Sequence, residues 1–182
     1  MLTDLQRKKL TRYFHLYDRD GDGNIGPADF ERVVENVRIM SGLSPESHRH
    51  QGLRRTYLAR WESLRRSADA DQDGRIDVSD WLAYWDGVLQ ADDRYQAEVA
   101  SVVRRLFDFF DADQDGYIGL HEFSDLYASY GLSSALARSI FTDLDVNHDG
   151  MISRQELLDI GHHFYRGDDP SAPGNRLFGP YD

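Results

Sequence analysis

Apolar residues recur three and four positions apart along most of the chain, in segments that come in pairs around short polar loops. Residues at this spacing share one face of a helix, so each segment predicts an amphipathic helix. The helix–loop–helix unit occurs four times, and the pattern stops after Phe164. The apolar positions are, in chain order, Leu10, Tyr13, Phe14, Tyr17, Phe30, Val33, Val34, Val37, Trp61, Leu64, Ala68, Trp81, Tyr84, Trp85, Val88, Val103, Leu106, Phe107, Phe110, Phe123, Leu126, Tyr127, Tyr130, Ala137, Ile140, Phe141 and Leu144.

Capping residues mark some of the helix ends. Ser44 is the expected N-cap of a long helix that runs from Pro45 towards Ala68, since proline is favoured in the first helical turn. The helix entering the third loop should span residues 98–110. Ser133 should cap the helix entering the fourth loop.

Each polar loop repeats one arrangement of oxygen-bearing side chains. Asp or Asn occupies positions 1, 3 and 5, glycine occupies position 6, and an acid occupies position 12. This set suits a hard divalent cation, and the glycine permits the sharp turn, so the loops predict four calcium-binding EF-hands. Position 7 contributes its backbone carbonyl, and position 9 a side chain where it has one. The candidate metal ligands are Asp18, Asp20, Asp22, Asn24, Asp29, Asp69, Asp71, Asp73, Arg75, Asp77, Asp80, Asp111, Asp113, Asp115, Tyr117, Glu122, Asp145, Asn147, Asp149, Met151, Ser153 and Glu156.

The acid at position 12 differs between the first two loops and the last two. Glu122 and Glu156 can reach an ion with both oxygens and complete about seven ligands, as calcium prefers. Asp29 and Asp80 are one methylene shorter and favour a smaller cage of about six ligands, as magnesium prefers. We therefore expect up to four Ca²⁺ ions, with Mg²⁺ competing chiefly at sites 1 and 2.

Position 8 is isoleucine in all four loops: Ile25, Ile76, Ile118 and Ile152. A β-branched residue favours a short strand, so two loops can pair through a minimal two-stranded bridge. The predicted fold is all-α, with four EF-hands in two paired lobes that pack into one compact globule. The lobes should comprise hands 1 and 2 in residues 1–91 and hands 3 and 4 in residues 92–165.

Residues 166–182 have a different character. Three prolines and three glycines exclude a helix there. Leu177, Phe178 and Tyr181 are nevertheless apolar, so we expect this tail to pack on the globule and cover apolar surface between the lobes. The alternative is a disordered tail, which is common at chain ends.

Composition and charge narrow the possible functions. The net charge is −11, which disfavours nucleic acid as a partner, and sixteen of the 32 acidic residues are candidate ligands. The chain has no cysteine, no apolar run of signal-peptide length at its start, and no run of 18 apolar residues. Leu2 stands where N-myristoylation requires glycine. We expect a cytoplasmic, monomeric protein without a membrane partner.

Taken together, the loops resemble those of the sarcoplasmic calcium-binding protein family, and most closely its bacterial calerythrin-like members. The resemblance rests on the four loops, the long gap between hands 1 and 2, the short gap between hands 3 and 4, Asp29, and the apolar tail. It implies a single globule and a role as an intracellular calcium and magnesium buffer. The second loop of such proteins is often degenerate, whereas here its acids are all present, so we expect it to bind.

Three functions compete. A buffer binds ions with little outward change, whereas a sensor opens a groove for a protein target and favours methionine-rich surfaces; the chain has three methionines. A photoprotein-like carrier would hold a small molecule with aromatic residues, but we interpret Trp61, Trp81 and Trp85 as core. His48 and His50 should lie on a solvated helix face. No nucleophile–base pair or phosphate-binding glycine loop suggests an enzyme.

Overall fold

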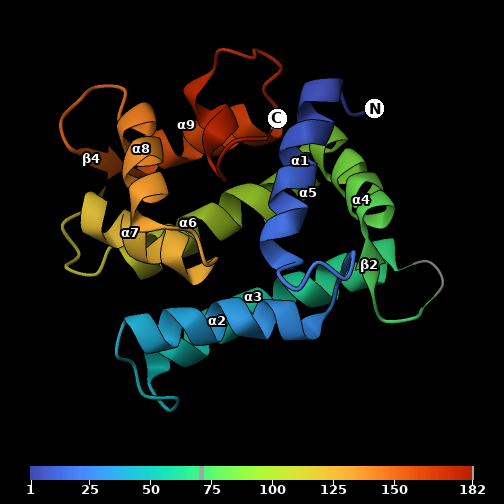
Figure 1. The fold of residues 1–182 in the computed structure, drawn as a ribbon, viewed down its shortest axis with the longest axis horizontal. Helices are drawn as coiled ribbons and strands as arrows, with labels where there is room; N and C mark the ends of the chain where they lie inside the picture. The colour runs from blue at the N-terminus through green and yellow to red at the C-terminus, as the bar shows by residue number, and fades with distance from the viewer. Residues whose placement is uncertain (70–71, 182) are drawn as a thin grey trace.

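The computed structural model describes residues 1–69 and 72–181, and its elements follow the four helix–loop–helix units (Figure 1). Hand 1 comprises α1 (Asp4–Tyr17), β1 (Asn24–Ile25) and α2 (Pro27–Met40); hand 2 comprises α3 (His48–Ala68), β2 (Ile76–Asp77) and α4 (Val78–Gln90). Hand 3 comprises α5 (Asp92–Tyr95), a π-helical turn (Gln96–Ala100), α6 (Ser101–Phe110), β3 (Tyr117–Gly119) and α7 (Leu120–Ser129). Hand 4 comprises α8 (Ser134–Leu144), β4 (Met151–Ser153) and α9 (Arg154–Tyr165), and a 3₁₀ turn, η2 (Pro173–Arg176), follows.

The position-8 isoleucines pair the loops as predicted. β1 and β2 are antiparallel with Ile25 opposite Ile76, and β3 and β4 are antiparallel with Ile118 opposite Ile152. All four side chains are buried. Each bridge therefore joins two loops and anchors them in the core beneath, which confirms the two paired lobes.

Helix starts follow local capping chemistry, with one correction. The Ser133 hydroxyl accepts from the Leu136 N–H and caps α8 as predicted. The predicted cap at Ser44 is wrong, because α3 begins at His48 and the hydroxyl of Ser47 accepts from the His50 N–H. A turn precedes the helix, since the Ser47 N–H donates to the Ser44 carbonyl. Helical structure in hand 3 also begins earlier than residue 98, at Asp92.

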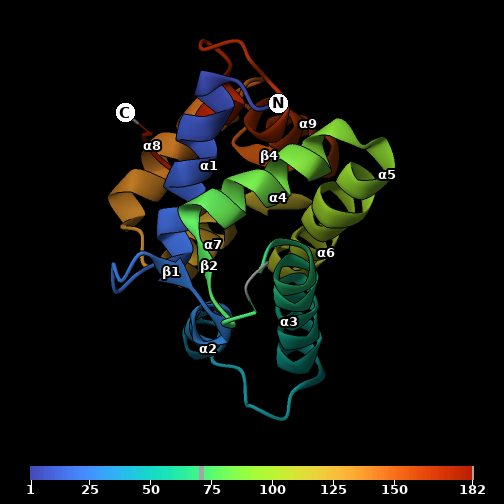
Figure 2. The same ribbon diagram turned by 90° about the vertical axis from the view of Figure 1, so that its right-hand side faces the viewer.

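Both lobes contribute to one aromatic core. Trp81 lies against Tyr13 and Phe14 of α1, and its indole N–H donates to the Leu10 carbonyl at 2.9 Å. The α2 helix packs on α3 within its own lobe and on α7 of the other, and the turned view shows α2 and α3 along one edge (Figure 2). The three tryptophans are buried as predicted, but so is His50, because its face of α3 turns inward rather than to solvent.

The segment after α9 returns across both lobes. Phe178 stacks on Tyr13 of α1 with ring centroids 4.2 Å apart, and Leu177 is buried. The Tyr127 hydroxyl of α7 donates to the Leu177 carbonyl. Contrary to the expectation of no helix, η2 forms a single turn, which begins at Pro173 because proline is compatible with a first helical position.

Candidate metal centres in the four loops

All four loops share one backbone turn. The position-6 glycine has φ between 79° and 87°, a left-handed conformation that glycine adopts without steric cost. Position 4 is also left-handed, in Gly21, Gln72, Gln114 and His148. The turn directs the position-6 N–H to the position-1 carboxylate, at 3.2 Å in the first three loops and 2.9 Å in the fourth. This hydrogen bond therefore fixes the orientation of the position-1 carboxylate in each loop.

The position-5 aspartate is fixed by a second local hydrogen bond. Its Oδ1 accepts from the position-7 N–H: Asp22 from Asn24 at 2.8 Å, and Asp115 from Tyr117 at 2.8 Å. The corresponding distances in the second and fourth loops are 2.7 and 2.9 Å. A short aspartate side chain readily accepts a hydrogen bond from the backbone N–H two residues later in the chain. The local sequence alone therefore positions these carboxylates.

Buried carboxylate oxygens show that the loops fit a cation. Oδ1 of Asp18, Asp69 and Asp111 is buried and has no hydrogen-bond partner among the described residues. A buried, unpaired carboxylate oxygen is costly unless a cation or donor satisfies it. An ion held by these oxygens would remove that cost, and the all-oxygen donor set suits calcium.

The position-12 acids are placed differently in loops 1 and 3. The carboxylates of Asp111, Asp113 and Glu122 come within 4.8 Å of one another, whereas the group in loop 1 is Asp18, Asp20 and Asp22. Asp29 lies outside this group, although its Oδ2 accepts from the Gly26 N–H at 2.8 Å. The difference agrees with the shorter reach of aspartate.

Arg32 is a neighbour of site 1 that the sequence analysis missed. Its Nη2 lies 3.1 Å from Asp29 Oδ1 and also donates to the Tyr17 carbonyl. The spacing of three residues along α2 is the signal that could have revealed the pair. Arg32 thus holds the position-12 carboxylate of loop 1 against the end of α1.

Loops 2 and 4 show other features. Asp71 lies outside the described residues, while Asp77 caps α4 by accepting from the N–H groups of Ser79 and Asp80. In loop 4, both oxygens of Asp145 accept backbone N–H groups, from Asp149 and Gly150. The acids of loop 4 do not form a group like those of loops 1 and 3 in the described chain. Asn147 stands there at the position where the other loops have aspartate.

No described helix combines the length and apolar character needed to cross a membrane.

Family models match both halves of the chain. An EF-hand domain pair matches residues 100–160, and an EF hand matches residues 11–34 and 66–83. These matches contain the loops whose geometry is described above. Calcium binding therefore rests on family models as well as on the acidic groups.

Known proteins resemble the chain over most of its length. Calerythrin of Saccharopolyspora erythraea is 25% identical, covering 92% of this chain and 96% of the relative. The luciferin-binding protein of Renilla reniformis is 27% identical, covering 95% and 92%. A sarcoplasmic calcium-binding protein from amphioxus shares the fold, with a TM-score of 0.73, 20% identity and full coverage of both chains. The chain is a calcium-binding EF-hand protein, and over most of its length it is similar to calerythrin and to a sarcoplasmic calcium-binding protein.

Proposed function

We propose that the protein is an intracellular Ca²⁺/Mg²⁺ buffer that binds up to four ions through the ligand set predicted for its loops. The observation that carries the proposal is the filled space between the lobes. Phe178 stacks on Tyr13 and meets Phe164 edge-on at 4.9 Å, while Leu177 is buried beside them. A sensor must expose an apolar groove when calcium binds, and here tail side chains occupy the apolar interior.

The composition of the core supports a fixed packing. It consists of aromatic and branched aliphatic side chains, whereas sensors favour methionines that repack on varied targets. Met1, Met40 and Met151 all lie at the surface. Ion binding would then change loop order and charge with little change in the outer shape.

Interior space also disfavours a small-molecule carrier, despite the relative named as a luciferin-binding protein. The apolar cavity between the lobes has a volume of about 60 Å³. Ligand pockets for drug-sized molecules are about 300–1,000 Å³. Tail residues Leu177 and Phe178 line this cavity, so they take space that a ligand would need.

Calorimetric titration with calcium tests the buffer, with and without millimolar magnesium. We expect four bound calcium ions, magnesium competition mainly at two sites, and little calcium-dependent binding of a hydrophobic dye. Truncation after Gly167 should expose apolar surface to the dye. A sharp calcium-dependent rise in dye binding by the full chain would instead establish a sensor, and two ions at saturation would contradict the four-site proposal.

Asp29→Glu tests cation choice at site 1. The longer side chain should reach the ion with both oxygens, so calcium affinity should rise about tenfold relative to magnesium. Glu122→Asp is the matched reverse change at site 3 and should lower that preference. Competition calorimetry measures both, and an unchanged preference in both variants would refute the ligand-reach argument.

A further inference from the structure

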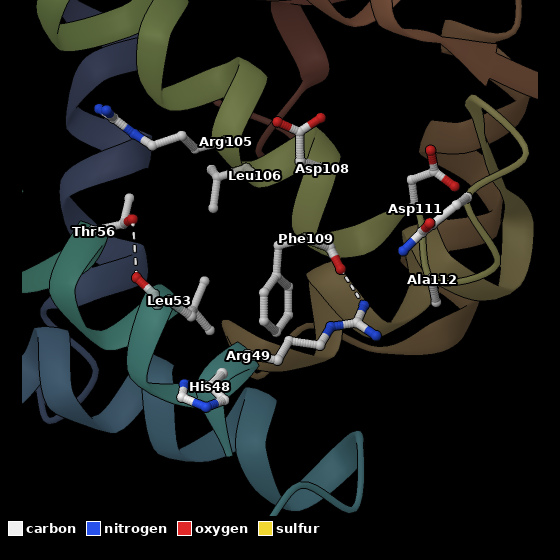
Figure 3. A pocket seen from close by; sticks show the side chains of 12 residues that line it. His48, Arg49, Leu53, Thr56, Arg105, Leu106, Asp108, Phe109, Asp111 and Ala112 are labelled. Carbon is white, nitrogen blue, oxygen red and sulfur yellow. Dashed lines mark hydrogen bonds between the residues drawn. The ribbon is translucent and has the colours of Figure 1, made fainter. Parts of the chain in front are cut away.

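A long groove runs between α3 and α6. Two adjoining hollows of about 400 and 480 Å³ share Gly52, Thr56 and Arg105 in their linings. Their α3 lining extends from His48 to Arg66, which corresponds to about 27 Å of helix at about 1.5 Å per residue. Figure 3 shows the end at His48, where Arg49 reaches across to the carbonyl of Phe109 on α6.

This groove, named here the α3–α6 groove, is rich in arginine although the protein has a net charge of −11. Its lining includes five arginines: Arg49, Arg55, Arg60, Arg66 and Arg105. Arg49 stacks on Phe109 at 4.7 Å, and Arg60 donates to the Glu98 carbonyl at 3.3 Å. Arg55 and Arg105 are exposed and make no ion pair within the described chain. Two guanidinium groups therefore face the groove without a carboxylate.

Two of the three acidic residues that line the groove interact with other side chains. Asp108 pairs with Arg154 at 2.6 Å, and Glu98 accepts from the Ser63 hydroxyl at 2.5 Å. Asp111 lies at the far end, in the third metal loop. The middle of the groove, where Gly52 and Thr56 leave room between the helices, is thus flanked by free positive charge.

We propose that the α3–α6 groove binds an acidic helical segment of a partner protein, whose carboxylates pair with Arg55 and Arg105. Arginine offers two parallel donors that match a carboxylate, and the unpaired cations supply the charge complementarity. The length of the groove matches a helix of about 18 residues rather than a compact ligand. Nucleic acid is disfavoured because the rest of the surface would repel its phosphates.

The docking site differs from a sensor groove because it is present without separation of the lobes. A buffer held at this face would keep its bound ions beside the partner, and its target surface would not depend on displacement of the tail. The proposal therefore goes beyond buffering, and a failed docking test would leave the ion-binding proposal unaffected.

A labelled 18-residue helical peptide with glutamates flanking a leucine stripe is the probe, and the same peptide with glutamine for every glutamate is its control. Fluorescence anisotropy at low and physiological salt, with calcium present, measures binding. We expect the glutamate peptide to bind at least about tenfold more tightly than the glutamine peptide, with affinity falling as salt rises.

Arg55→Gln combined with Arg105→Gln should weaken glutamate-peptide binding about tenfold or more. Arg104→Gln is the matched control, since Arg104 is exposed on α6 but does not line the groove. Unchanged thermal unfolding would show that the variants fold. Absence of glutamate-peptide binding, equal losses in the double and control variants, or tighter binding of a single-stranded nucleic acid would overturn the proposal.

Discussion

Lys9 is fully buried, and its ammonium group joins α1 to the last part of the chain. Its Nζ donates to the carbonyls of His163 and Gly167 and to Asn175 Oδ1, each at 2.9 Å. Burial lowers the pKa of Lys9 to about 8, while the nearby charge of Asp168 opposes that shift. Three ammonium donors thus match three acceptors, so the charge is accommodated by hydrogen bonds from segments distant in sequence.

Replacing Lys9 by methionine should destabilise the protein. Lys9→Met keeps a similar length but leaves three acceptors without their donor, so we expect a loss of about 2–4 kcal/mol in unfolding free energy. Lys8→Met is the control, because Lys8 is exposed on the same helix and is the other lysine of the chain. Chemical denaturation in calcium measures both; equal small effects would refute the role given to Lys9.

Close approach between η2 and α9 depends on Gly174. A Cβ at this position would lie 2.6 Å from the Ile160 carbonyl oxygen and 2.6 Å from the His163 Cβ, both nearer than real Cβ contacts. The Ile160 carbonyl belongs to the helix backbone and cannot rotate away. Asn175, next along η2, is buried and donates to the Asp169 carbonyl at 2.7 Å, so the turn has little freedom to shift.

Gly174→Ala should therefore displace η2 from α9. We expect a loss of about 1–3 kcal/mol in unfolding free energy and faster proteolysis within the tail. Gly161→Ala is the control on α9, where the new Cβ would meet Val103 at an ordinary 3.7 Å and helix propensity would improve. Thermal unfolding and limited proteolysis compare the two, and equal tail cleavage in both would contradict the packing argument.

At the scale of elements, the sequence predicts what depends on local chemistry. Helical spacing locates the helices, the position-8 isoleucines predict the strand pairs, and Ser133 marks a true cap. The predicted helix start at Ser44 was wrong because Ser47, about one turn later, offers the same capping chemistry. The π-helical turn at Gln96–Ala100 and the inward face of His50 have no local signal, since packing between helices determines them.

Several buried tyrosines couple the stability of the core to alkaline pH. Burial raises the pKa of Tyr17, Tyr57, Tyr127, Tyr130 and Tyr165 well above the usual value. The Tyr57 and Tyr130 hydroxyls lie 3.0 Å apart and join the two lobes. Ionisation of any of these groups inside the core is therefore opposed by the fold.

Stability should fall steeply as pH rises above about 10, the pKa of tyrosine in an unfolded chain. There the unfolded state loses phenolic protons that the folded state keeps, so unfolding becomes more favourable with increasing pH. Each buried tyrosine contributes up to about 1.4 kcal/mol per pH unit. Tyr17→Phe should lower the slope by one proton, and tyrosinate absorbance should appear together with loss of helical circular dichroism. Tyrosinate formation in the fully helical protein would contradict this.

The ligands of the metal loops could be predicted from the sequence, whereas the tertiary contacts around the loops could not. The pattern of Asp or Asn at positions 1, 3 and 5 followed by glycine located the four loops. The short reach of Asp29 agrees with its place outside the group of Asp18, Asp20 and Asp22. The pairing of Lys9 with Asn175 could not be predicted, because it joins residues 166 positions apart and depends on how two lobes and a tail meet. The α3–α6 groove is also a tertiary feature without a motif.

The contacts of Lys9 also bear on the order in which the chain can fold during synthesis. Its acceptors are made 154 to 166 residues later, so α1 leaves the ribosome long before its buried charge has partners. Contacts so distant in sequence form late because a long loop must close first. The helix that enters the first metal loop is therefore translated early but gains these contacts late.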